Sequence, residues 1–439
     1  MLATLRTKNR WDVLFIILLI PLSLWYWAGV PGIPFHPDES TFLYMSADWE
    51  TLLTHPNDLA WQPDSSNPGQ TLRLLDAPLG RYLAGAARWM AGIPTSASDW
   101  SWSASWEQNR QAGALPGPAL LLAGRMGQAV LFPFSLLFIY LTGVKLNGRF
   151  LGWSAALLLG LNAIFLLHTR RAQAESGLVF AITLTLLCLA CCQKRPWLIA
   201  IPAALAFCAK QSALPLMIAG LAAIWVYRSK PVSLHGLGKA LGLYLALYAG
   251  VVLILNPFLW AHPVEAGQAA ITARQELLAR QTLEYGQLAP DLILNSPGKA
   301  AFSMLANLFI VPPSIAEAGN YLDQTRLSAD AYLSYPLHQL FRSLMGGGLL
   351  LTLCLVGCAC AGRAILKPGN PHRGQIALIG LAGLLLFLGL SLTITLPFQR
   401  YVIPLVPFTV LSIAYGLDQV VLVLRHARRF VNRPRSVDL

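Results

Sequence analysis

Charged residues are scarce in this sequence. Asp, Glu, Lys and Arg make up 12% of its 439 residues, whereas soluble globular proteins carry roughly 25%. So few charges cannot cover a water-facing surface for a chain of this length, which excludes a soluble protein. The hydrophobic content of 55% and the mean hydropathy of +0.54 indicate a protein for which the bilayer is the solvent.

Several familiar motifs are also missing. The sequence has no GxxxxGK[ST], no GxGxxG, no paired CxxC and no HExxH or HxxxH spacing, so nucleotide-binding loops and zinc sites have no support. No Lys/Arg run is interleaved with aromatic residues, which argues against nucleic-acid binding. All seven cysteines fall within or at the ends of apolar segments, so no disulfide framework is predicted. They are Cys188, Cys191, Cys192, Cys208, Cys354, Cys358 and Cys360.

Long apolar segments are abundant. A spanning helix needs about 20 mostly apolar residues, and the hydropathy pattern predicts an all-α polytopic membrane protein with about ten transmembrane helices. Lys210 interrupts the fifth and sixth, which are the weakest candidates. The predicted spans are 12–30, 116–144, 150–168, 175–193, 196–209, 211–227, 240–260, 344–362, 375–396 and 401–424.

The net charge of +12 follows from this topology. With ten spans and both termini in the cytoplasm, 18 of the 32 Lys and Arg residues but only 3 of the 20 Asp and Glu residues lie on the inner side. Basic residues concentrated in short cytoplasmic loops follow the positive-inside rule. The excess of positive charge is therefore explained by membrane orientation and needs no polyanionic partner.

The same topology divides the chain into six parts. The N-terminal tail and a retained first span occupy 1–30, and the first span lacks a small-residue cleavage site. Two long outer loops follow the first and the seventh spans, and the stretch 80–92 of the first loop predicts an amphipathic helix lying at the interface. In the second loop, 266–286 predicts a helix ending at Gly286. The two outer loops occupy 31–115 and 261–343. Spans 2–7 lie within 116–260, spans 8–10 lie within 344–424, and a basic cytoplasmic tail covers 425–439.

Ionisable residues recur where predicted spans meet the outer face. A charge at membrane depth costs at least about 2.5–3.5 kcal/mol, so such residues are candidates for function. Each basic residue taken singly is compatible with a side chain that snorkels from a helix end. Their gathering on one side, from five separate stretches, argues for a site. The carboxylates are Asp38, Glu39 and Glu175, with Asp76 in the loop, and the cations are Arg81, Arg170, Arg171, Lys210 and Arg400.

This set of residues suits a phosphate leaving group. Cations stabilise the negative charge that a lipid-linked phosphate gains as its bond breaks, and a carboxylate can act as general base. A carboxylate beside several cations stays ionised but is a weak base. Positioning by such a carboxylate could therefore contribute more than proton abstraction.

Five motifs resemble those of the GT-C membrane glycosyltransferases, and the protein O-mannosyltransferase and lipid A aminoarabinose transferase branch in particular. They occur in the family's order over nearly the whole chain. The sequence departs from the pattern twice: DAPL replaces the usual PPL, and Glu175 stands where Asp is commoner. The motifs are HPDES (36–40), DAPLGRYL (76–83), RRAQAES (170–176), AKQS (209–212) and RYVIPLVP (400–407).

The resemblance implies a helical membrane bundle with interface helices in a long first outer loop. It also implies transfer of a sugar, with inversion, from a polyprenyl-phosphate donor to a lipid, glycan or protein acceptor. By position, Asp38 would be the general base or an orienting carboxylate, and Glu39 and Glu175 would complete the catalytic carboxylates. A divalent cation near Asp38 and Glu39 is compatible with this reading. The donor phosphate would be bound by Lys210, Arg400, Arg81 and Arg170, and the sugar or acceptor by Asp76, Tyr82 and Tyr401.

The main alternative is a transporter or flippase of a lipid-linked sugar. It would predict charges in the middle of spans and an internal repeat, and neither is evident. A polymerase or ligase acting on lipid diphosphates is a third reading, in which the large outer loop comes late in the chain. The lack of disulfides and of an N-x-[ST] sequon in the outer loops favours a bacterial inner membrane.

Overall fold

The computed structural model describes residues 10–63, 65, 67–228, 233–316 and 319–431. Within these residues the chain forms helices and connecting loops, with no β-strand. Residues 1–9 and 432–439 lie outside the described residues, and with them the first residues of the predicted N-terminal tail and much of the predicted tail 425–439.

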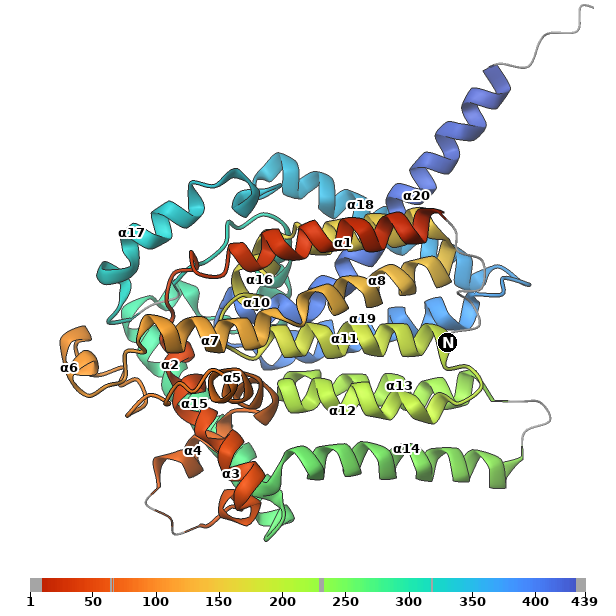
Figure 1. Ribbon diagram of the computed structural model, residues 1–439. Coiled ribbons are helices and arrows are strands. Elements are labelled where there is room, and N and C mark those ends of the chain that lie inside the picture. The colour runs from red at the N-terminus through yellow and green to blue at the C-terminus, as the bar shows by residue number, and fades with distance from the viewer. Residues whose placement is uncertain (1–9, 64, 66, 229–232, 317–318, 432–439) are drawn as a thin grey trace, which may run out of the picture.

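Long apolar helices lie side by side in a single bundle (Figure 1). The expected all-α membrane bundle is thereby confirmed. Its helices are α1 (Arg10–Ala28), α7 (Pro118–Ala129), α8 (Phe132–Asn147), α9 (Arg149–Gly160), α10 (Ala163–Thr169), α11 (Glu175–Cys191), α12 (Ala200–Ala209), α13 (Pro215–Val226), α14 (Leu234–Leu255), α18 (Leu344–Leu366), α19 (Arg373–Thr393) and α20 (Val406–Val431).

Each of the ten predicted spans coincides with one or more of these helices. By length and composition six helices of the described chain can cross a membrane, and the count is seven if α9 and α10, which are bent by 59°, form one span. The bend falls at Asn162, whose side chain accepts a hydrogen bond from the Phe165 amide and starts the second segment. The other three apolar helices have only 10–17 residues: Glu175–Cys191, Pro196–Ala209 and Gln211–Val226.

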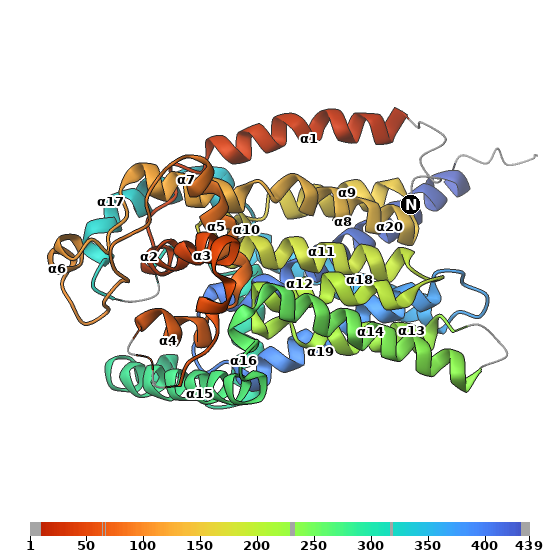
Figure 2. The same cartoon turned by 60° about the horizontal axis from the view of Figure 1, so that its bottom comes forward.

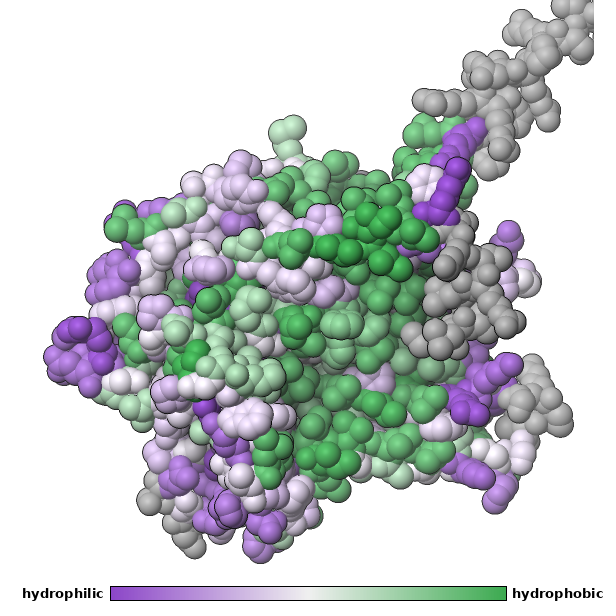
Figure 3. Space-filling model, in the orientation of Figure 1, coloured by the Kyte–Doolittle hydropathy of each residue, from purple (hydrophilic) through white to green (hydrophobic). Residues whose placement is uncertain are grey.

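The outer surface of the bundle is apolar. Figure 3 shows a hydrophobic band across the middle of the molecule and polar residues at both ends. On α1, Ile17 and Ile20 are 55% and 59% exposed, and on α18 Met345 is 89% exposed. Because so much contiguous apolar surface is not tolerated in water, the chain is an integral membrane protein.

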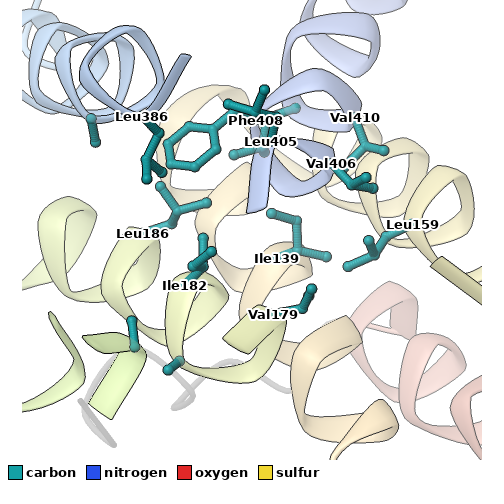
Figure 4. Packing of buried hydrophobic residues seen from close by; sticks show 14 of the residues in the cluster. Ile139, Leu159, Val179, Ile182, Leu186, Leu386, Leu405, Val406, Phe408 and Val410 are labelled. Atoms are coloured by element: carbon teal, nitrogen blue, oxygen red, sulfur yellow. The ribbon is translucent and has the colours of Figure 1, made fainter. Parts of the chain in front are cut away.

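The interior of the bundle is built from branched aliphatic side chains. Figure 4 shows Ile139 of α8, Leu159 of α9 and Ile182 of α11 meeting residues of α19 and α20. Two glycines let α18 and α20 approach very closely: a Cβ on Gly357 would meet the Ser412 carbonyl, and one on Gly416 would meet the Leu353 carbonyl. Small residues at such crossings are typical of helix packing in membranes.

The two long outer loops gather at one end of the bundle, which we call the outer end (Figures 1 and 2). The connections α8–α9, α11–α12 and α18–α19 lie at the opposite end. The outer end therefore carries most of the polar helical structure. Its helices are α2 (Pro37–Tyr44), α3 (Asp48–Thr54), α4 (Pro68–Leu75), α5 (Pro78–Met90), α6 (Trp106–Gln111), α15 (Pro263–Leu288), α16 (Pro297–Phe309) and α17 (Leu322–Leu333).

Two details of the predicted loop helices are corrected. The helix expected over 266–286 begins at Pro263 and runs through Gly286 to Leu288. The helix expected over 80–92 is α5, which begins at Pro78 and ends at Met90; it buries Arg81 and Arg88, and Met90 is 74% exposed. These arginines can be buried because each forms an ion pair with an acidic side chain of α3: Arg81 with Asp48, and Arg88 with Glu50.

Candidate active site

The acidic motif after the first span starts helix α2. His36 is the N-cap residue: its Nδ1 accepts a hydrogen bond from the Asp38 amide (3.2 Å), and its own amide donates to Glu39 Oε2 (3.1 Å). With Pro37 at the first helical position this is a strong local start signal. The two carboxylates leave the first turn in different directions, since Glu39 is fully buried and Asp38 is 25% exposed.

Glu39 is held by a buried arginine. Arg125 of α7 binds it with two bonds of 2.7 Å, from Nε to Oε1 and from Nη2 to Oε2. The Ala172 amide donates to Oε1 at 2.9 Å, and the other guanidinium nitrogen donates to the Ile33 carbonyl at 2.8 Å. The pair thus joins the end of the first span, α2, α7 and the loop before α11 around one carboxylate.

Asp38 pairs with Arg400. The Arg400 Nη1 forms an ion pair with Asp38 Oδ2, which joins positions 362 residues apart in the sequence. Arg400 lies in the short 3-10 helix η9 (Gln399–Leu405) that precedes α20. Neither side chain is fully buried, with exposed fractions of 25% for Asp38 and 15% for Arg400.

A second ion pair lies beside the first. Lys210 Nζ donates to Glu175 Oε1 at 2.8 Å, and its ammonium lies 5.5 Å from the centroid of the Tyr401 ring. The Arg400 guanidinium is 5.8 Å from the same ring. Lys210 reaches this position because the chain turns extended there, between α12 and the next helical turn. We call Asp38, Glu175, Lys210, Arg400 and Tyr401 the outer-face cluster.

Asp76 and Arg81 lie next to the cluster. The Arg81 Nη1 donates to the Asp76 carbonyl at 2.9 Å, and its Nε is 3.0 Å from Asp48 Oδ2. Burial raises the pKa of the Asp76 carboxyl, and nearby cations, Arg274 first and then Arg81 and Lys210, partly oppose the rise. Asp76 is therefore within electrostatic reach of the lysine of the cluster.

Two of the predicted binding residues lie deeper. Tyr82 is 4% exposed and its ring faces Arg81, whose guanidinium is 5.5 Å from the centroid. Arg170 is fully buried, donates to the Tyr26 carbonyl (3.0 Å) and lies 4.7 Å from the centre of the Tyr26 ring. Its Nη1 is 3.4 Å from His338 Nε2, so Arg170 ties the first span to the second outer loop.

No protein-family model matches the sequence, and no curated protein is significantly similar to it. Solved structures are similar. The archaeal oligosaccharyltransferase AglB from Archaeoglobus fulgidus, in complex with an inhibitory peptide and a dolichol-phosphate, aligns with a TM-score of 0.53 and 12% identity, covering 98% of this chain and 53% of that one. ArnT from Cupriavidus metallidurans, bound to undecaprenyl phosphate, aligns with a TM-score of 0.53 and 11% identity, covering 93% and 60%.

The chain has the GT-C fold. A third structure, the Archaeoglobus fulgidus oligosaccharyltransferase in complex with Zn and sulfate, aligns with a TM-score of 0.52 and 13% identity over 93% of this chain. The chain spans 49% to 60% of the length of these three relatives. At such low identities the likeness establishes the fold alone.

The structure places three further charged residues near the candidate site that the sequence motifs did not indicate: Arg125, Asp48 and Arg274. Arg125 carried a readable signal, because it is an ionisable residue inside an apolar run. Asp48, which pairs with both Arg73 and Arg81, and Arg274, which binds the Leu75 carbonyl, carried none, because each lies in an ordinary polar helix whose partner is far away in sequence.

The carboxylates of this GT-C fold do not suit a divalent cation as they stand. Both Glu39 oxygens are engaged by Arg125, and the Ala172 and His36 amides take further acceptor positions, while Asp38 is paired with Arg400. Among the described residues no group of three or more His, Cys, Asp and Glu side chains could hold a metal ion.

Proposed function

We propose that the protein is an inverting glycosyltransferase that moves a sugar from a polyprenyl-phosphate donor to an acceptor at the outer, periplasmic face of a bacterial inner membrane. The observation that carries this proposal is the outer-face cluster. Four segments of the chain bring together two cations, two carboxylates and a tyrosine at the boundary between the apolar bundle and the polar outer end.

The location of the cluster matches the chemistry of the donor. A polyprenyl phosphate keeps its chain in the bilayer and its phosphate at the interface, where Lys210 and Arg400 lie at helix ends. Solved relatives of the same fold contain dolichol-phosphate or undecaprenyl phosphate, which supports a lipid of this class. Arg81 and Arg170, one beside Asp76 and one behind the first span, would support the cationic environment without touching the phosphate.

The reaction needs one bond to form and one to break. An acceptor hydroxyl oxygen bonds to the anomeric carbon on the face opposite the phosphate, the bond from that carbon to the phosphate oxygen breaks, and its electron pair leaves with the phosphate. Lys210 and Arg400 would stabilise the charge that develops on the phosphate, which is the largest contribution to be expected from such a site.

The carboxylates would then orient the acceptor. Asp38 is the exposed acid of the pair, so it can accept a hydrogen bond from the attacking hydroxyl and receive its proton. Its pairing with Arg400 makes it a weak base in the resting site, so alignment is its larger role. Glu175 would position Lys210, and Tyr401 and Asp76 would contact the sugar or the acceptor, with Tyr82 in support behind Arg81.

The proposal is tested by release of polyprenyl phosphate. Purified wild type and Asp38→Asn, in liposomes, are incubated with a panel of polyprenyl-phosphate sugars and with membrane extract as the source of acceptor. Release by wild type and its loss in Asp38→Asn supports transfer. A folded wild type that releases no polyprenyl phosphate but moves donor across the liposome would favour a flippase and overturn the proposal.

A further inference from the structure

We infer that Trp102 is the exposed floor of a subsite that binds a pyranose ring of the acceptor, so that the acceptor is itself a glycan or glycolipid. This inference rests on the proposed function. Trp102 is 50% exposed, although the loop that carries it is tightly fixed. The exposure of the indole ring is therefore a fixed feature of the fold.

Hydrogen bonds from two directions hold the loop around Trp102. Asn320 of the second outer loop donates to the Ser101 carbonyl at 3.0 Å and to the Ala104 carbonyl, and its Oδ1 accepts from Trp100 Nε1 at 3.1 Å. Asn109 donates to the same Ser101 carbonyl at 2.9 Å. Because the loop is already ordered, binding a ligand there costs less conformational entropy.

The Trp102 indole ring packs edge-on against His36 and Tyr321. Ring centroids are 6.4 Å apart for Trp102 and His36 and 6.2 Å apart for Trp102 and Tyr321. Gly319 makes room: it has φ +133°, and a Cβ there would lie 2.9 Å from the indole. His36 in turn caps the helix turn that carries Asp38, so Trp102 lies one side chain away from the outer-face cluster.

His36 stays neutral in this layer. Burial holds the pKa of its imidazole well below 6.5, and the positive charges of Arg171 and Arg400 lower it further. Nδ1 accepts from the Asp38 amide and lies 3.1 Å from the Gln173 side-chain amide, which leaves the proton on Nε2. The layer between Trp102 and the acid is thus aromatic and uncharged.

The surroundings of Trp102 favour a sugar over other ligands. Figure 1 shows α6, the helix that follows the Trp102 loop, at the outer extremity of the molecule, and Figure 3 shows polar surface there, away from the hydrophobic band. The neighbouring Ser101 and Ser103 are exposed hydroxyl residues, so a flat aromatic face is flanked by hydrogen-bonding groups without charge. The axial C–H bonds of a pyranose suit the negative face of an indole ring.

The test measures saturation transfer from the protein to small sugars. The full chain in lipid nanodiscs is titrated with methyl glycosides of glucose, galactose, mannose and N-acetylglucosamine, and with a Ser/Thr-rich peptide, by saturation-transfer difference NMR. We expect transfer to ring protons of at least one glycoside, with about 3- to 10-fold weaker binding in Trp102→Ala. Trp102→Phe should keep part of the binding. Trp89→Ala, which removes a tryptophan 52% exposed in the same outer loop, is the matched control and should keep all of it.

The outcomes separate this inference from the proposed function. Three results would each overturn the glycan subsite. They are no saturation transfer to any glycoside, equal glycoside binding by wild type and Trp102→Ala, and Trp102-dependent binding of the peptide alone. If no donor is cleaved but glycosides still depend on Trp102, the transferase proposal fails and the subsite survives as a sugar-binding surface.

Discussion

Glu39→Gln separates a structural role from a direct role of Glu39 in the reaction. The carboxylate accepts two bonds of 2.7 Å from Arg125, one of 2.9 Å from the Ala172 amide and one of 3.1 Å from the His36 amide. A glutamine has one acceptor oxygen and would turn an NH₂ group toward the donors of Arg125. The guanidinium, 3% exposed, would then be a buried charge without a counter-ion.

Breaking a buried ion pair in this way costs about 3–5 kcal/mol. Because the unfolding entropy grows with chain length, for 439 residues this corresponds to a fall in Tm of roughly 3–5 °C. We expect this fall in thermal unfolding of detergent-solubilised Glu39→Gln, together with loss of activity, because α2 and Asp38 lose their anchor. The double variant Glu39→Leu, Arg125→Met removes both charges and should recover much of the Tm without recovering activity.

The opposite pattern would refute this reasoning. If Glu39→Gln unfolds at the temperature of wild type and is nevertheless inactive, the anchor is unimportant and Glu39 acts on substrate directly. If the variant is both stable and active, the ion pair with Arg125 contributes to neither property. Thermal unfolding and release of polyprenyl phosphate, measured on the same preparation, distinguish the three cases.

Three further substitutions have expected outcomes. Lys210→Met removes a cation from the donor phosphate and should raise the donor KM about 10- to 100-fold, whereas Lys299→Met on α16 should not; an unchanged KM would show that the phosphate binds elsewhere. Gly357→Leu should prevent the close approach of α18 and α20 and abolish the monodisperse peak in size-exclusion chromatography. Gly362→Leu on the same helix should be tolerated, because a Cβ there meets no atom within 4 Å. Equal behaviour of the two variants would contradict the close crossing. Because burial raises the pKa of Asp76 above 3.8, its stabilising contribution is complete below that value and is lost as pH rises through the raised pKa. Asp76→Asn should therefore raise Tm at about pH 7 and change it little at about pH 4, and a fall at pH 7 would mean that nearby cations outweigh burial.

Hydropathy and charge, read along the chain, were sufficient for the helices. Each of the ten predicted spans coincides with helical structure, although three are shorter than a full span. This works because the cost of placing a residue in hydrocarbon is set mainly by that residue and its close neighbours. Positions at the ends of such helices were likewise readable, and Asp38, Glu175, Lys210 and Arg400 do meet in the structure.

Partner choice was decided only by the tertiary structure. Glu39 and Arg125 are 86 residues apart, and nothing local distinguishes Glu39, which is buried in that pair, from Asp38, which faces Arg400. Arg81 and Arg88 lie on the polar side of an amphipathic helix, and both are buried because Asp48 and Glu50 of α3 provide counter-charges there. Local sequence determines which segments become helices and which ends carry charge, whereas the pairing of buried charges depends on packing between distant segments, because a charge can be buried only where a partner compensates its lost hydration.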